Sequence, residues 1–462
     1  MRGNRWILPG LLILIGCDCG PTAATTQPAA PVVSEEAPAE ETPGDESADE
    51  NAPEPSGISS PVTGDIPAPS QEQMAAFAQA SNAFGFDLYE KTREATPEGN
   101  LALSPASIAL AFDMVFAGAR GETAAEMSRV MHVEGDSSAV NEAASRILAR
   151  FNDPNREDYE LQVVNRLFGE ETYTFEQDFL TLTHTQYRAP LEGIDFRGAP
   201  EDARQHINRW VAEQTAERIT DLLPPDSIRS DARLVLVNAI YFLGTWTTPF
   251  EERATADVPF SLPDGARVDV PTMHQVIHMA HANVDGVTVV ELPYEGDELV
   301  MTLVVPDAVD GLGALEERLD AETFDSWVTA AAAPTPGHLG APMVSLFLPR
   351  FEMRTKVMLS EHLKALGMRQ AFLDGVADFT GIANPPDPTD RLHISEAYHQ
   401  VFVAVDERGT EAAGATAIVM GRGTGGPPPP PVEVRVDRPF LFAIRERASG
   451  AVLFLGRIND PR

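Results

Sequence analysis

The chain has 462 residues, of which 70 are Asp or Glu and 34 are Lys or Arg, so its formal net charge is −36. A chain this acidic is not expected to bind nucleic acid or anionic lipid surfaces, whose phosphates would repel it. Both cysteines, Cys17 and Cys19, lie near the N-terminus, so the rest of the chain can form neither a disulfide nor a thiolate metal site.

Residues 1–16 have the pattern of an export signal, because Arg2 and Arg5 precede an apolar run at 6–15 that is too short to span a bilayer. The sequence Leu-Ile-Gly-Cys at 14–17 resembles a bacterial lipobox, which implies cleavage before Cys17 and lipidation of its thiol. A chance cysteine in an ordinary signal peptide is the alternative. We therefore expect an exported lipoprotein, anchored by this lipid alone on the extracytoplasmic side of a bacterial membrane or at the cell surface, and otherwise secreted.

Residues 17–73 are rich in Pro, Ala, Glu, Thr and Ser, and contain no Lys or Arg. Such a segment has too few large apolar residues to offset its ordering entropy. We expect a disordered acidic tether here, followed by a globular domain at 74–462.

The globular part begins with helices. Phe77, Phe84 and Leu88 recur at helical spacing, Ser104-Pro105 opens a second helix, and a third is expected over 201–219. Strands are expected at short β-rich runs bounded by Gly, Pro and Asp, namely 234–242, 287–292, 299–305, 344–348, 401–405, 432–436, 440–444 and 451–455. Helices early and strands late predict an α+β fold with antiparallel or mixed sheets.

Signatures of an enzyme are missing from the sequence, which has no Gly-x-Ser-x-Gly elbow, no His-Glu-x-x-His and no P-loop. His274, His278 and His281 have the spacing of metal ligands on a helix. They follow Pro271 among predicted strands, however, where this spacing does not bring side chains together. We therefore expect no enzyme activity, no metal and no cofactor.

The segment 407–420 changes abruptly from large residues to small ones. Side chains of a strand alternate between two faces. One face would carry Thr410, Ala412, Gly414, Thr416, Ile418 and Met420, and the other Glu411, Ala413, Ala415, Ala417 and Val419. The first face has no charge, so the segment could be an open loop and could also enter between two strands. A small-residue linker is the alternative.

The sequence at 407–416, Glu-Arg-Gly-Thr-Glu-Ala-Ala-Gly-Ala-Thr, resembles the hinge of the serpins at every defined position of the family pattern. Further motifs follow in the family's order: Leu-Ser-Pro-Ala-Ser-Ile at 103–108, Asn-Ala-Ile-Tyr-Phe-Leu-Gly-Thr-Trp at 238–246, Leu-Pro-Arg-Phe at 348–351, Ala-Asp-Phe-Thr-Gly at 377–381 and Val-Asp-Arg-Pro-Phe-Leu-Phe at 436–442. Together they cover the whole globular part.

This resemblance implies the serpin fold, with three β-sheets surrounded by about nine helices, an exposed reactive-centre loop and a metastable native state. It assigns the hinge to Glu407, Gly409, Thr410, Glu411, Ala412, Ala413, Gly414, Ala415 and Thr416. It places Ser104, Ser107, Asn238 and His399 in the shutter that opens the main sheet, and Trp246 at the breach where insertion begins.

The implied function is suicide inhibition of a serine-type protease by a monomeric inhibitor, with a cysteine-type protease as the alternative target. The family's spacing from Glu407 puts the scissile bond at Gly423-Thr424, and a loop one residue shorter puts it at Arg422-Gly423, which would suit trypsin-like enzymes. A bond after Met420 would suit chymotrypsin- or subtilisin-like enzymes. Residues 425–431 hold a Gly/Pro insertion relative to the family. A non-inhibitory serpin acting as a surface binding or chaperone-like protein is the alternative.

Overall fold

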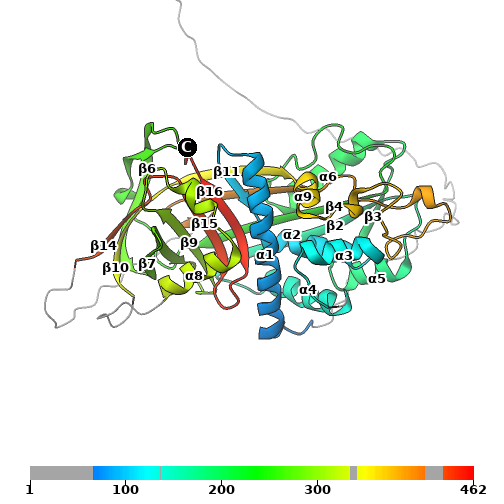
Figure 1. The fold of residues 1–462 in the computed structure, drawn as a ribbon, viewed down its shortest axis with the longest axis horizontal. Coiled ribbons are helices and arrows are strands. Elements are labelled where there is room, and N and C mark those ends of the chain that lie inside the picture. Colours follow the sequence, from blue (N-terminus) through cyan, green and yellow to red (C-terminus); the bar gives the residue numbers. More distant parts are fainter. Residues whose placement is uncertain (1–65, 136, 333–340, 411–429) are drawn as a thin grey trace, which may run out of the picture. The chain divides into compact units, whose positions relative to one another are not determined.

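The structure, a computed structural model, describes residues 66–135, 137–332, 341–410 and 430–462. Within these ranges the chain forms three β-sheets and nine α-helices (Figure 1). The α+β class and the three-sheet architecture expected from the sequence are confirmed.

The helices concentrate in the first part of the chain, as predicted. They are α1 (Gln71–Ala95), α2 (Pro105–Phe116), α3 (Gly121–Val130), α4 (Ser137–Phe151), α5 (Gln177–Thr185), α6 (Pro200–Gln214), α7 (Leu312–Glu316), α8 (Ala321–Ala332) and α9 (Ser360–Leu366). Polar caps fix where the first two begin: the Ser70 side chain accepts a hydrogen bond from the backbone N–H of Gln73, and that of Ser104 accepts one from Ser107.

The main sheet has six strands in the order β11-β12-β13-β4-β2-β3. Their bounds are β11 Phe351–Met358, β12 Tyr398–Val405, β13 Gly409–Thr410, β4 Leu234–Thr245, β2 Tyr159–Glu170 and β3 Leu191–Ile194. β2 and β4 pair along their length, from Tyr159 opposite Gly244 to Gly169 opposite Leu234.

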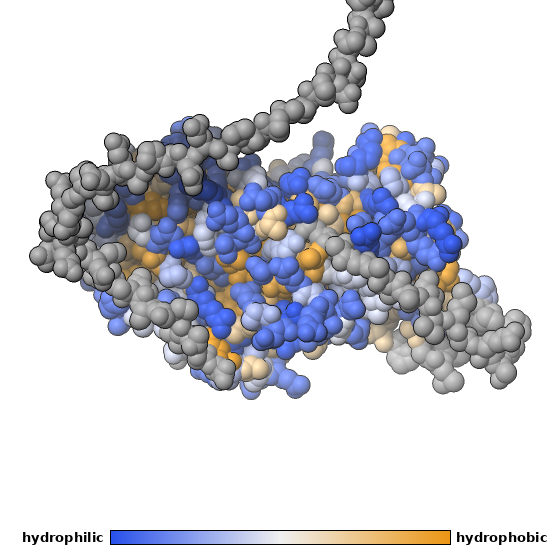
Figure 2. Space-filling view, turned by 180° about the vertical axis from the view of Figure 1, so that it is seen from behind, coloured by the Kyte–Doolittle hydropathy of each residue, from blue (hydrophilic) through white to orange (hydrophobic). Residues whose placement is uncertain are grey.

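The second sheet has the order β1-β16-β15-β9-β8-β7, and the third has the order β14-β10-β6-β5. Their strands are β1 Leu101–Leu103, β5 Ala256–Ser261, β6 Arg267–His278, β7 His281–Val284, β8 Val287–Pro293, β9 Leu299–Pro306, β10 Met343–Pro349, β14 Val432–Arg435, β15 Phe440–Glu446 and β16 Val452–Ile458. α8 packs on β7 and β8. On the face opposite that of Figure 1, hydrophilic side chains predominate, with hydrophobic patches between them (Figure 2).

The two faces of β4 belong to two hydrophobic cores, because successive side chains of a strand point to opposite faces. Ile240 and Phe242 belong to the large core, and Leu234 and Leu236 pack against it. Val235, Val237 and Ala239 belong to or pack against a smaller cluster built with α6, including Ile207 and Val211. Even-numbered residues of β4 therefore face the large core, and odd-numbered residues face α6.

Every strand predicted from the sequence is present, but the third helix was predicted too long. α6 ends at Gln214 rather than at 219. Ala216 and Glu217 take positive φ values of 46° and 60°, which end the helix before the prolines at 224 and 225 are reached. The side-chain oxygen of Thr215 then accepts a hydrogen bond from the backbone of Ile219, which stabilises this turn.

Candidate functional site

Among the described residues, one strand position in the main sheet is occupied only at one end, by β13. β13 pairs with β12 through Val405 opposite Thr410, and with β4 through Thr410 opposite Gly244. Among the described residues, no other ladder joins β12 to β4. We call this position, between β4 and β12 beyond β13, the slot. Because β13 is antiparallel to both neighbours, β4 and β12 run parallel to each other along it.

A tight turn after β12 directs the chain into the slot. The Asp406 carboxylate accepts hydrogen bonds from the backbone N–H groups of Arg408 (2.8 Å) and Gly409 (3.3 Å), and the Asp406 N–H donates to the Gly409 carbonyl (3.0 Å). Gly409 lies so close to β4 that an added Cβ would sit 1.9 Å from the Gly244 carbonyl oxygen. Only glycine fits there, which explains the glycine of the hinge pattern at this position.

Thr410 is buried at the entrance to the slot, at 2% exposure. Its hydroxyl lies 2.7 Å from the Tyr294 hydroxyl, and burial raises the pKa of Tyr294. Trp246 stacks on Tyr294 with ring centroids 4.5 Å apart, and its indole N–H donates to the Asp406 carbonyl (3.0 Å). The structure thus brings the predicted breach residue, Trp246, to the point where the hinge enters the sheet.

Glu407 anchors the chain just before this entrance. Its side chain is only 4% exposed and accepts a hydrogen bond from Arg350 Nε at 2.7 Å and another from the Thr255 hydroxyl. Burial acts to raise the pKa of Glu407, but the hydrogen bonds from Arg350 and Thr255 outweigh it, so the pKa is lowered. The carboxylate therefore stays ionised.

The four predicted shutter residues lie together on the core side of the slot. The backbone N–H of Ser104 donates to His399 Nε2 (3.0 Å), and the Ser107 hydroxyl donates to the Asn238 side-chain oxygen (2.6 Å). The Asn238 amide donates in turn to Asn165 of β2 (2.9 Å). This network joins α2 to strands on both sides of the slot.

His399 sits in this network as a neutral ring. Burial lowers its pKa to about 3, and its Nδ1 has no hydrogen-bond partner among the described residues. Nε2 must be unprotonated to accept the Ser104 N–H, so the proton is carried by Nδ1. A proton added to Nε2 would break the link between α2 and β12.

A cavity of about 100 Å³ lies at the far end of the slot. It is lined mainly by apolar side chains from α2, the first residues of β4 and the segment before β12, including Ile108, Phe112, Leu234, Leu236, Leu392 and Ile394.

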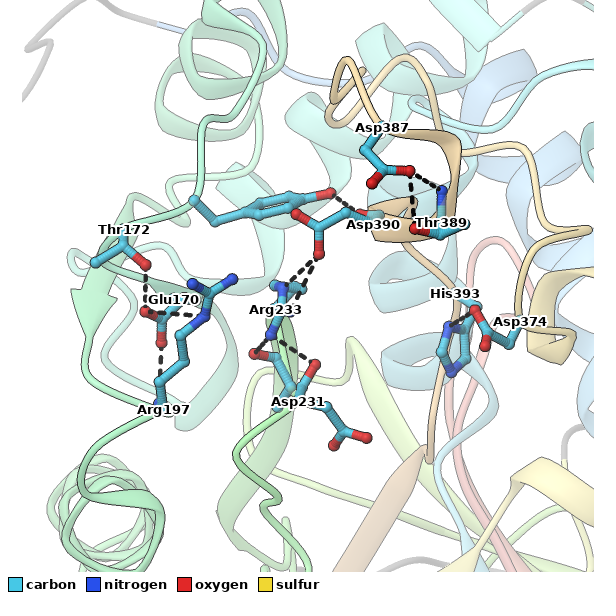
Figure 3. Close-up of polar contacts among 12 residues, drawn as sticks. Glu170, Thr172, Arg197, Asp231, Arg233, Asp374, Asp387, Thr389, Asp390 and His393 are labelled. Atoms are coloured by element: carbon cyan, nitrogen blue, oxygen red, sulfur yellow. Dashed lines mark hydrogen bonds and ion pairs between the residues drawn. The ribbon is translucent and has the colours of Figure 1, made fainter.

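One ion pair crosses the far end of the slot (Figure 3). Arg233, directly before β4, donates from Nε to Asp390 Oδ1 at 3.1 Å, and Asp390 lies on the segment leading to β12. The Tyr173 hydroxyl donates to the Asp390 carbonyl (2.5 Å), and the Arg233 guanidinium lies over the Tyr173 ring. We call this contact between Arg233 and Asp390 the clasp. Beside it, Glu170 accepts hydrogen bonds from the backbone of Phe196 and Arg197.

Sequence reasoning missed the partners of the motif residues. Tyr294, Thr255, Asn165 and Asp390 carry no local signal, because each meets its partner only in the folded chain. Arg350 lies inside the Leu-Pro-Arg-Phe motif. Its positive charge is a signal that could have been matched to the negative charge of Glu407 in the hinge.

Several predicted residues lie outside the described residues. They are Cys17, the later hinge residues Glu411, Ala412, Ala413, Gly414, Ala415 and Thr416, and the scissile-bond candidates Met420, Arg422, Gly423 and Thr424.

The three histidines considered as metal ligands lie on strands. His274 stacks on Phe347 and lies 3.0 Å from the Ser345 hydroxyl, and His278 contacts the Ala341 carbonyl at 2.9 Å. Within the described ranges, no group of three or more His, Cys, Asp or Glu side chains is arranged to hold a metal ion.

Comparison with known proteins gives one consistent family. The profile described as "Serpin (serine protease inhibitor)" matches residues 79–461. Leukocyte elastase inhibitor from Homo sapiens is 38% identical over 396 residues, which cover 84% of this chain and 100% of the relative. Serpin B3 from Homo sapiens is 35% identical over 405 residues with the same coverage. The crystal structure of uncleaved ovalbumin superimposes with a TM-score of 0.72 at 29% identity, covering 83% of this chain and 100% of ovalbumin.

The predicted localisation, export with a lipid anchor outside a bacterial membrane, is wrong on these findings. The relatives are leukocyte elastase inhibitors and serpins B3 and B4, a group of serpins that is typically intracellular. The lipobox-like Leu-Ile-Gly-Cys lies in the part of the chain that these relatives do not cover. In the described part of the chain, no helix has the length and hydrophobicity needed to cross a bilayer.

Proposed function

Because the chain belongs to the serpin family, we propose that it is an inhibitory serpin. Its globular part, residues 74–462, would act as a monomer that traps a serine-type protease as an acyl-enzyme by inserting its cleaved reactive-centre loop into the main sheet. The observation that carries this proposal is the slot, whose entrance is already occupied by Gly409 and Thr410.

The register of β13 sets where each later residue would go. Thr410 lies opposite Gly244, and an antiparallel strand moves one position along its partner per residue. Continued in this register, the eleven residues from Thr410 to Met420 would lie opposite Gly244 back to Leu234. The sheet would thus receive the whole small-residue segment and no charged residue beyond Glu411.

The same register decides which side chains would face the core. Residues directly opposite each other in a sheet share a face, so the even-numbered loop residues would join the even-numbered residues of β4. Thr416 would meet the shutter at Asn238, while Ile418 and Met420 would lie opposite Leu236 and Leu234, at the apolar cavity. The largest inserted side chains would therefore fill the empty space.

The odd-numbered residues would face α6, where space is limited by its cluster with β4. Ala413, Ala415 and Ala417 are small enough for that layer. Glu411 would lie opposite Leu243, at the end of the sheet beyond the cluster with α6.

Mechanistically, the protease supplies the nucleophile and this chain supplies the movement. The protease serine attacks the scissile carbonyl, the peptide C–N bond breaks, and the loop remains esterified to the protease while the new amino terminus leaves. Because Thr410 already lies in the sheet, ten residues up to Met420 would be inserted, and at about 3.3 Å each they would carry the ester roughly 33 Å along the sheet. The free energy comes from new ladder hydrogen bonds and from burial of the loop's apolar side chains.

The target protease depends on the scissile bond, for which Arg422-Gly423, Gly423-Thr424 and the bond after Met420 stay open. Arg422 would favour trypsin-like enzymes, because their pocket carboxylate pairs with a guanidinium. The name of the relatives adds elastase to the candidates.

The test is to mix the purified chain with trypsin, chymotrypsin, subtilisin and elastase, and to look for a complex that survives SDS. Sequencing the released C-terminal peptide identifies the bond. Each protease with its active-site serine blocked beforehand is the control and should give no complex. If no protease forms a complex, and cleavage of the loop leaves heat stability unchanged, the chain is a non-inhibitory serpin with a binding function.

A further inference from the structure

A groove of about 800 Å³ lies away from the slot, between α1, α2, the end of α3 and α4. These helices lie together on the face seen in Figure 1. The groove exists because the walls carry small side chains where neighbouring helices usually interdigitate larger ones. These small residues are Ala76, Ala80, Ala83, Ser128, Ala139 and Ala143.

A buried carboxyl group forms part of the floor. Asp113 lies one turn after Ala109 on α2, and both line the groove. Asp113 is 4% exposed, and its Oδ1 has no hydrogen-bond partner among the described residues. Burial raises the pKa of Asp113 to about 8. A carboxyl oxygen buried without a partner is unfavourable, so a ligand that donates a hydrogen bond to Oδ1 would offset that cost.

The charges at the rim are mostly negative. Glu72 of α1, Glu134 after α3 and Glu142 of α4 line the groove together with two basic residues, Arg129 and His132. Each of these two lies beside a carboxylate of its own, at 3.2 and 2.7 Å. Glu142 is likewise paired with Arg146 at 2.6 Å, so Glu72 and Glu134 are the rim charges that have no ion-pair partner among the described residues. The groove therefore presents a negative field to a ligand, and it would attract a cation rather than an anion.

The groove also offers apolar surface, so a ligand that fills it needs an apolar part. Phe77 of α1 lines the groove and packs edge-on against Phe151 of α4, with ring centroids 6.4 Å apart. Alanine methyl groups and this ring offer an aliphatic or aromatic chain a surface on both sides.

We propose that this groove binds a small organic amine, with the ammonium group beside Asp113 and the apolar body between α1 and α4. Binding as an ion pair would ionise the Asp113 carboxyl group and release its proton to solvent. Nothing in this proposal depends on the inhibitory function.

The probes are n-hexylamine and 1-hexanol, which share the alkyl chain and differ in charge. Calorimetric titration of the full chain at pH 7 should give tighter binding of hexylamine by at least about tenfold, the usual effect of a charged hydrogen bond. Its binding heat should also vary with the ionisation enthalpy of the buffer, because a proton is released.

Two variants separate the ion pair from the cavity. Asp113→Asn has nearly the same shape and should abolish the preference for hexylamine over hexanol. Ala80→Leu would place a larger side chain in the groove without touching the carboxyl group, so it should weaken both probes. Equal binding of both probes by the wild type, survival of the preference in Asp113→Asn, or unchanged affinities in Ala80→Leu would each overturn the proposal. Ala80→Leu gives a result even if Asp113→Asn fails to fold.

Discussion

A charged side chain at position 410 would have to enter a space that now holds one buried threonine. Thr410 is 2% exposed, and its only polar neighbour described is the Tyr294 hydroxyl. In Thr410→Arg, the guanidinium would be buried without a carboxylate partner, which costs about 3 to 5 kcal/mol. The expected result is that the hinge leaves the sheet.

That cost falls on the insertion step. If it raises the insertion barrier by the same amount, insertion slows by about 150- to 5,000-fold, while hydrolysis of the acyl-enzyme is unchanged. The variant should then be cut as a substrate. The measurement is the number of inhibitor molecules consumed per protease inactivated, together with the yield of SDS-stable complex.

Glu411→Arg is the matched control, because the neighbouring residue would face the other side of the inserted strand, at the end of the sheet. It should keep most of the inhibitory activity. A Thr410→Arg variant that inhibits with the stoichiometry of the wild type would refute the idea that insertion begins at β13.

Three further changes probe the contacts around the slot. Glu407→Gln removes a buried charge that pairs with Arg350, so the urea midpoint should fall by the equivalent of about 1 to 3 kcal/mol. Glu252→Gln, at an exposed pair, should change the midpoint little. His399 is neutral in the folded chain, because its pKa of about 3 lies below the unfolded value of 6.5. The stability that comes from this neutral ring is therefore present above pH 6.5 and is lost as the pH falls. Between pH 7 and 5, the free energy of unfolding in urea should fall by about 2 kcal/mol more for the wild type than for His399→Gln. Arg233→Met removes the ion pair of the clasp and should lower the free energy of unfolding by about 1 kcal/mol. The control Arg229→Met, at a side chain that is 78% exposed, should have no effect. Equal urea midpoints for the two variants would show that the clasp does not stabilise the native state.

Local sequence predicted part of the sheets, namely strands β4, β8, β9, β10, β12, β14, β15 and β16. The strand at 234–242 and the capped helix after Ser104 were both found, because periodicity and capping act within a few residues. β2 was missed although Leu161 and Val163 alternate with polar residues, a signal that the sequence does contain. α6 was overextended because no residue type announces the positive φ values at 216 and 217.

Long-range pairing accounts for what the sequence left out of the site. The family resemblance selected Ser107, Asn238 and His399. Asn165 becomes their neighbour only when β2 pairs with β4, and Tyr294 meets Thr410 only when the residue after β8 packs against the main sheet. Nothing in the sequence distinguishes Asp113 from other helical aspartates, because the groove that it lines is formed by four separate helices.

In the proposed register, the inserted strand would fill the cavity at the far end of the slot. If this mainly apolar cavity holds no water before insertion, and Ile418 and Met420 then fill it, about 100 Å³ of empty space disappears, which corresponds to about 60 mL/mol. Pressure favours whichever state occupies less volume, so about 100 MPa would shift the balance towards insertion by roughly tenfold. Hydrostatic pressure would then push this protein towards its inserted state without any protease.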